Sequence, residues 1–104
     1  MRYNIVSSLI ALHLLAMQTY AQEKHTLSGT ITDSSTGETM IGATVSVREL
    51  PGTGTISNAY GYYSLTLPEG KYTVTIIFIG FQPFIQSIDF IEDILIDVAL
   101  STNA

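Results

Sequence analysis

The chain has 104 residues, with 9 acidic and 4 basic side chains for a net charge of −5, and it contains no cysteine. The acidic balance, with a pI near 4.6, excludes nucleic acid as an expected partner, because nucleic acid requires a basic face on the protein. Without cysteine there can be no disulfide framework, thiolate metal site or cysteine nucleophile.

The first 21 residues are predicted to be a cleavable secretory signal peptide. Arg2 supplies the charge of the n-region, residues 5–17 form an apolar h-region, and Thr19 and Ala21 are the small residues that signal peptidase reads. The apolar stretch is shorter than the roughly 20 residues of a transmembrane helix. The alternative is a buried N-terminal helix. Cleavage after Ala21 leaves one domain, residues 22–104, in which we expect no direct membrane insertion.

From Thr26 onward, apolar and polar residues alternate with period two, the pattern of strands with one buried face. Turn-forming sequences separate the runs; Pro68-Glu69-Gly70, for example, matches a type I turn. This organisation predicts an all-β, seven-stranded antiparallel sandwich. The expected strands lie near residues 26–33, 43–49, 54–57, 62–67, 71–79, 81–89 and 94–100.

Three local features predict where individual strands lie. The run at 71–79 becomes apolar on both faces at its end, which indicates a central strand. Pro83 has no N–H to donate, so its strand is expected at an edge or at a bulge. Tyr72, two residues after Gly70, is expected to form a tyrosine corner, in which its hydroxyl bonds to the backbone upstream.

The sequence predicts no catalytic, cofactor-binding or metal-binding residue. A zinc peptidase needs three protein ligands and a general base, whereas residues 22–104 contain the single histidine His25, interpreted as a solvated terminal residue. A Ca²⁺ site at Glu92-Asp93 would need six or more oxygens, and only Asp89 and Asp97 lie near in sequence, so the pair is interpreted as a solvated turn.

Four aromatic residues are candidates for contact with a protein partner, because they could form an exposed aromatic patch. Core packing is the alternative for at least half of them. The four residues are Tyr60, Tyr62, Phe81 and Phe84.

The order of several short motifs, from Thr26 to Leu100, resembles the carboxypeptidase-regulatory-like domain. Each motif is weak alone, and their order and spacing carry the resemblance. The chain departs from the family pattern at Thr39 and Ile41, where proline is frequent, and at Ser57-Asn58, where the family usually has Thr-Asp. The motifs are Gly29-Thr30-Ile31-Thr32-Asp33, Thr36-Gly37-Glu38, 41–47, 54–58, 60–65, 67–74, Ile79-Gly80-Phe81 and Val98-Ala99-Leu100.

This resemblance implies a prealbumin-like (transthyretin-like, Greek-key) sandwich that carries none of the chemistry of the peptidases. In Bacteroidetes-type bacteria, such domains follow the signal peptide of TonB-dependent outer-membrane receptors, including nutrient importers of the SusC type. The implied location is the periplasm, at the outer membrane. The implied partner is a protein of the cell envelope: the receptor plug and barrel or a component of the TonB system.

Three functions therefore follow from the sequence as hypotheses. The favoured one is a non-catalytic structural or interaction module of a TonB-dependent receptor system, of which this chain would be an N-terminal fragment. The second is a free-standing secreted binding module, adhesin-like or carbohydrate-binding. The third is an accessory domain of a peptidase.

Overall fold

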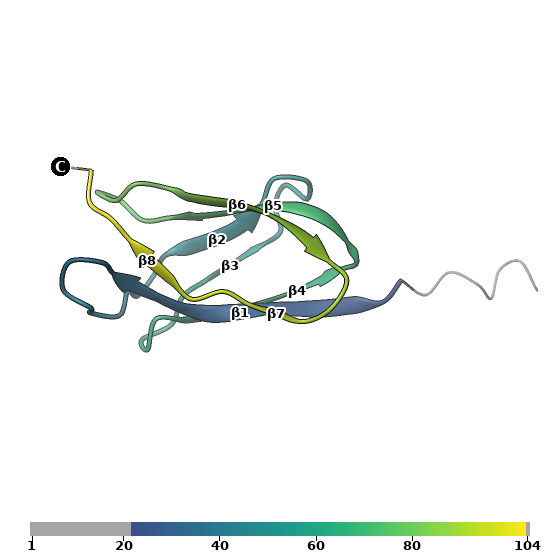
Figure 1. Cartoon of the computed structure of the whole chain (residues 1–104), viewed down its shortest axis with the longest axis horizontal. Helices are drawn as coiled ribbons and strands as arrows, with labels where there is room; N and C mark the ends of the chain where they lie inside the picture. The colour runs from purple at the N-terminus through teal and green to yellow at the C-terminus, as the bar shows by residue number, and fades with distance from the viewer. Residues whose placement is uncertain (1–21, 104) are drawn as a thin grey trace, which may run out of the picture.

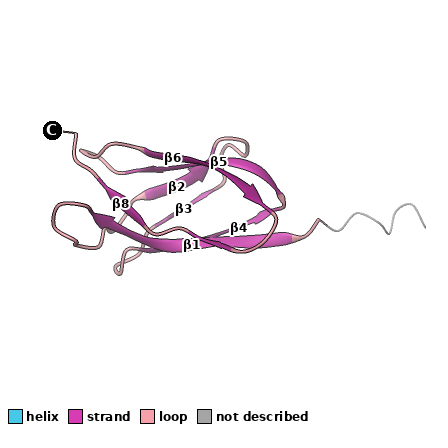
Figure 2. Ribbon diagram, viewed as in Figure 1, coloured by secondary structure: helices cyan, strands magenta, loops and turns pink. Residues whose placement is uncertain are grey.

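A computed structural model describes residues 22–103, and the predicted signal peptide lies outside the described residues. The described part contains eight strands and no helix (Figures 1 and 2). A helix long and apolar enough to cross a membrane is therefore not found among these residues. The strands are β1 (Lys24–Asp33), β2 (Thr44–Val47), β3 (Gly54–Ile56), β4 (Tyr62–Pro68), β5 (Gly70–Ile77), β6 (Phe84–Phe90), β7 (Ile94–Leu95) and β8 (Val98–Leu100).

The strands form two sheets that pack face to face, as the sequence predicts. In the first sheet, β1 lies between β4 on one side and β7 and β8 on the other. The second sheet has the order β3-β2-β5-β6, with every neighbouring pair antiparallel. The all-β sandwich class is confirmed, with one more strand than expected.

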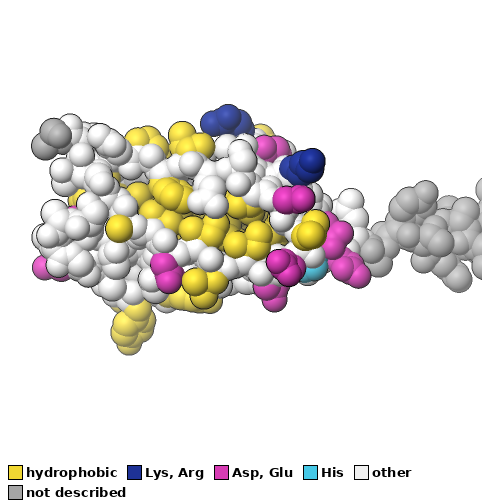
Figure 3. Space-filling view, viewed as in Figure 1, with side chains coloured by type: hydrophobic (Ala, Val, Ile, Leu, Met, Phe, Trp, Pro, Cys, Tyr) yellow, Lys and Arg dark blue, Asp and Glu magenta, His cyan; other side chains and the backbone are white. Residues whose placement is uncertain are grey.

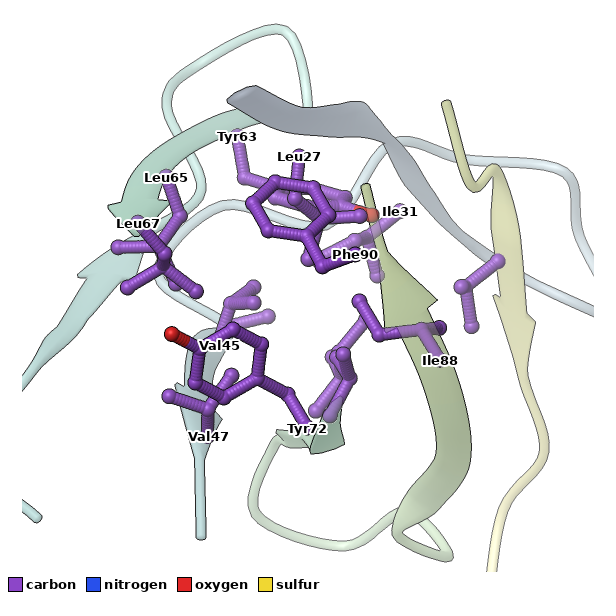
Figure 4. Packing of buried hydrophobic residues seen from close by; sticks show 14 of the residues in the cluster. Leu27, Ile31, Val45, Val47, Tyr63, Leu65, Leu67, Tyr72, Ile88 and Phe90 are labelled. Carbon is purple, nitrogen blue, oxygen red and sulfur yellow. The ribbon is translucent and has the colours of Figure 1, made fainter. Parts of the chain in front are cut away.

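The core lies between the sheets and is built from alternate residues of each long strand. Figure 4 shows Leu27 and Tyr63 of the first sheet facing Val45 of the second sheet across this space, and the ring of Phe90 extending from β6 toward Leu27. Phe90 is fully buried and contacts the ring of Tyr72 edge-on, with centroids 6.1 Å apart. Period-two alternation thus places one face of each long strand in a single apolar layer between the sheets, from which water is excluded.

Strand β5 is central, as predicted, because it pairs with β2 and with β6. The sequence argument for this position, that the end of the strand is apolar on both faces because both are buried, is not confirmed. The strand ends at Ile77, and the apolar residues at its end are not buried on both faces. Ile77 is exposed, and Ile79, 92% exposed, lies in the following turn. Their hydrophobicity reflects an uncovered surface rather than a second buried face.

The last predicted strand, 94–100, is wrong in two respects. It is split into β7 and β8, and both pair with β1 in parallel rather than antiparallel orientation. Between them, the Asp97 Oδ1 replaces a backbone acceptor and receives the Thr30 N–H at 2.9 Å. The Ile96 carbonyl turns inward and accepts a 2.7 Å hydrogen bond from the Tyr63 hydroxyl. At this break, side chains thus satisfy the Thr30 N–H and the Ile96 carbonyl, two backbone groups that strand pairing would satisfy in an unbroken ladder.

Strand β6 forms an edge of the second sheet, which agrees with the prediction from Pro83. It begins one residue after the proline, at Phe84, rather than at Phe81 as expected. Phe81 instead makes an isolated antiparallel bridge with Thr102. The proline thus precedes the ladder and interrupts nothing within it.

The described chain enters and leaves at opposite ends of the sandwich (Figure 1). We call the end that holds Gln22, the β4–β5 turn and the β6–β7 turn the N-terminal pole. The C-terminal pole holds residues 34–43, 57–61, 78–83 and 101–103. The Asn103 N–H bonds to the Gly80 carbonyl at 3.1 Å, which places the chain end beside the β5–β6 loop.

Candidate functional site

The four candidate contact residues separate into two exposed tyrosines and two partly buried phenylalanines. Tyr60 is 79% exposed and Tyr62 is 43% exposed. Phe81 and Phe84 pack against the core, and Phe81 contacts Phe78 edge-on with centroids 5.7 Å apart. The expectation that core packing would take at least half of the four therefore fits their burial. Their role in partner contact stays a prediction.

Tyr60 is presented by a tight turn that Asn58 organises. The Asn58 Oδ1 accepts hydrogen bonds from the backbone N–H of Tyr60 at 2.9 Å and of Tyr62 at 3.1 Å. Gly61 closes the turn with φ of 74°, and its N–H bonds to the Asn58 carbonyl. A side chain at position 61 would also meet the Ile31 carbonyl at 2.7 Å. The turn thus requires both residues, and it holds Tyr60 outward.

Ile41, also exposed at the C-terminal pole, is held by a buried serine. The Ser57 hydroxyl donates to the Met40 carbonyl at 2.6 Å and accepts the Ala43 N–H at 2.9 Å. These bonds clamp the loop on both sides of Ile41 and Gly42. The serine is 3% exposed, so it satisfies two backbone groups that water does not reach. The sequence analysis identified Ser57 and Ile41 only as departures from the family pattern.

Exposed apolar residues also lie on the outer face of the second sheet, next to this pole. Ile56 and Ile77 both lie opposite Thr44 in the ladder, on its two sides. Ile79, Ile77 and Thr44 line one open pocket, which Phe78 and Gly42 complete. We call the exposed residues Ile41, Ile56, Tyr60, Ile77 and Ile79 the apolar surface of the C-terminal pole.

The N-terminal pole is polar, and here the interpretation of His25 is wrong. Its ring does not extend into solvent: its side chain is 16% exposed, and the ring contacts Phe90 edge-on at 5.7 Å. The His25 Nε2 lies 2.8 Å from the Glu69 Oε1. Together with Glu23, these residues place three ligand atoms within 4.8 Å of one another. Sequence reasoning missed the cluster because Glu69 lies 44 residues from His25.

Three carboxylates, those of Glu49, Asp93 and Asp97, accept hydrogen bonds from backbone N–H groups of the strands. Asp93, interpreted as part of a solvated turn, accepts the Thr26 N–H at 2.8 Å. Glu49 accepts both the N–H and the hydroxyl of Thr73, and these bonds lower the pKa of the Glu49 carboxyl. These acids therefore terminate or bridge ladders, a structural use that accounts for part of the acidic charge.

Two buried tyrosines have structural roles. The Tyr72 hydroxyl donates to the Pro68 carbonyl at 2.7 Å, which confirms the predicted tyrosine corner. Burial, with a smaller contribution from the Asp97 charge, raises the pKa of Tyr63 to about 12. Tyr63 thus remains a neutral hydrogen-bond donor to the Ile96 carbonyl at physiological pH.

Comparison with solved structures shows the same sandwich in proteins of several kinds. The 5-hydroxyisourate hydrolase of Klebsiella pneumoniae superposes with a TM-score of 0.59 at 22% identity, over 76% of this chain and 92% of that chain. A type II cohesin–X-dockerin complex from Acetivibrio cellulolyticus gives a TM-score of 0.55 at 21% identity, over 71% of this chain and 52% of that chain.

A putative membrane-associated protein of unknown function from Bacteroides fragilis gives a TM-score of 0.56 at 18% identity, over 81% of this chain and 30% of that chain. The chain thus spans about half of the matched cohesin–dockerin chain and under a third of the Bacteroides protein. At these identities the likenesses show the fold alone, and the hydrolase activity belongs to the Klebsiella protein. No curated protein matches the chain.

The family comparison confirms the resemblance seen in the sequence motifs. A family model described as "CarboxypepD_reg-like domain" matches residues 27–104, which are all the strands except the first residues of β1. Domains of this type are regulatory rather than catalytic. The chain belongs to the CarboxypepD_reg-like domain family.

Proposed function

We propose that this chain is a non-catalytic interaction module of a TonB-dependent outer-membrane receptor system for nutrient uptake, located on the periplasmic side. The observation that carries the proposal is the position of the apolar surface of the C-terminal pole. It includes Tyr60, Ile79 and Ile41, and it lies at the pole where the described chain ends. A partner joined to or docked at this pole would cover it.

The chemistry of this surface suits a protein partner. Large aromatic and aliphatic side chains held on rigid turns lose little conformational entropy on binding, and such residues dominate protein interfaces. Asn58 and Ser57 hold the turns that present Tyr60 and Ile41. The family membership supports a place in the cell envelope, because the family resemblance implies such domains at the outer membrane of Bacteroidetes-type bacteria.

Site-specific photocrosslinking in the native host tests the partner directly. A photoreactive phenylalanine analogue replaces Tyr60 or Ile79, and the matched control carries it at Glu92, an exposed residue near the N-terminal pole. We expect crosslinks from positions 60 and 79 to a receptor plug or barrel, whether in the same polypeptide or in a separate chain, and none from position 92. Adducts of equal yield from all three positions would contradict the proposed surface.

Location and covalent context are tested separately. We expect the processed protein in the envelope fraction, with Gln22 as its first residue, and a plug and barrel encoded after Ala104. A stop codon there, together with protein in the culture medium, would support the free-standing secreted binding module instead. A zinc-ligand domain encoded after Ala104 would support the peptidase accessory domain.

A further inference from the structure

At the N-terminal pole, β1 and β4 extend past the apolar core. There, three polar residues occupy the side of these strands that faces the core elsewhere. Glu23 and His25 lie on the same side of the β1 chain as the buried Leu27, because alternate residues share a face. Glu69 follows the buried Leu67 of β4 with the same spacing. All three side chains therefore converge at the opening between the two sheets.

Backbone pairing places the two glutamates opposite each other. The β1–β4 pairing ends with Lys24 opposite Pro68. One residue further on, the Glu69 N–H donates a 2.9 Å hydrogen bond to the Glu23 carbonyl, so these two residues lie opposite each other. Like charges in directly opposite positions on one face destabilise an antiparallel pair. A cation between the two carboxylates would remove this repulsion.

His25 supplies an orienting nitrogen ligand beside the two carboxylates. Its ring is held by the edge-on contact with Phe90, and its Nε2 already lies 2.8 Å from the Glu69 Oε1. Figure 3 shows the histidine among acidic side chains at this end of the molecule. The Nε2 and one oxygen from each glutamate all lie within 4.8 Å of one another.

We propose that Glu23, His25 and Glu69 bind a divalent transition-metal ion, for which Zn²⁺ is the best match. Metal–ligand bonds of about 2.0–2.1 Å in tetrahedral geometry place neighbouring ligand atoms roughly 3.3–3.5 Å apart. The His25–Glu69 contact must therefore open slightly, and the exposed Glu23 must approach. Both glutamates are exposed enough to make these movements.

The ligand set also selects the class of cation. A neutral imidazole with two carboxylates carries a charge of −2, which a divalent ion neutralises. Imidazole suits zinc and related transition metals, whereas Ca²⁺ and Mg²⁺ prefer sets made only of oxygen. Water would complete the coordination. The ion would tie the start of β1 to the β4–β5 turn, at the pole opposite the proposed partner surface.

Isothermal titration calorimetry of the purified protein, prepared without a histidine tag, tests the site with Zn²⁺ alone. We expect saturable binding of one ion per chain. Glu23→Gln, Glu69→Gln and His25→Gln are each expected to weaken it at least about tenfold. Glu92→Gln is the matched control, because it removes the same charge from an exposed residue outside the cluster, and it is expected to leave the affinity unchanged.

Two further measurements use the unsubstituted protein, so folding defects in the variants cannot affect them. Co²⁺ in place of Zn²⁺ is expected to give the visible absorption of a tetrahedral site and to shift the NMR signals of the His25 ring. Zn²⁺ at 100 times its dissociation constant should raise the melting temperature by on the order of 10 °C. Absence of saturable binding, or equal binding by Glu23→Gln and Glu92→Gln, would overturn the proposal.

Discussion

Replacing Ser57 by alanine tests whether a single buried hydroxyl holds the loop that presents Ile41. The substitution removes the donor to the Met40 carbonyl and the acceptor of the Ala43 N–H. Met40 is 6% exposed and Ala43 is fully buried. Water therefore cannot replace the hydroxyl without an opening of the loop.

The expected magnitude follows from these two unsatisfied groups. A buried polar group that loses its partner costs about 1–3 kcal/mol, so Ser57→Ala should lower the free energy of unfolding by about 2–4 kcal/mol. For a domain of this size, about 1 kcal/mol corresponds to roughly 4–8 °C. The melting temperature should therefore fall by roughly 10–25 °C.

Urea unfolding followed by circular dichroism measures the change in free energy. Ser64→Ala is the control, because Ser64 is exposed on the outer face of β4, and its effect should stay within about 0.5 kcal/mol. An unchanged m value would show that both variants unfold from the same compact state. A loss below about 0.5 kcal/mol for Ser57→Ala would refute the reasoning, because the two backbone groups would then have other partners.

Three further predictions concern close contacts made by Gly29, Tyr72 and Tyr63. Gly29→Ala should cost at least about 2 kcal/mol, measured by urea unfolding, because a Cβ at this position would lie 1.9 Å from the Ile96 carbonyl oxygen; wild-type stability would contradict the observed path of the chain. Tyr72→Phe should cost about 1 kcal/mol in the same assay, through loss of the bond to Pro68, and no loss would show that the tyrosine corner is not stabilising. Tyr63 should ionise only near its pKa of about 12, so its contribution to stability is complete below pH 10, the unfolded pKa, and is lost as the pH rises toward 12. Tyrosinate absorbance should show one late-titrating group that Tyr63→Phe removes, and an unchanged titration in that variant would contradict the assignment.

Local sequence determined the strands, their buried faces and the turns between them. Alternation at Tyr72, Val74 and Ile76 predicted the core-facing side of β5, and all three residues are buried. The tyrosine corner and the edge position of the strand after Pro83 followed in the same way. These features depend on the period of the chain and on the conformational limits of single residues, which can be read without knowledge of distant neighbours.

Tertiary structure decided which strands pair, in what direction, and which distant residues meet. The chain between residues 94 and 100 reads as one strand, yet a parallel approach to β1 splits it where the Ile96 carbonyl turns toward Tyr63. His25 meets Glu69 only because β1 pairs with β4 in one particular register. A period of two defines the faces of a strand but not its partner, and the partner depends on contacts between residues far apart in the sequence.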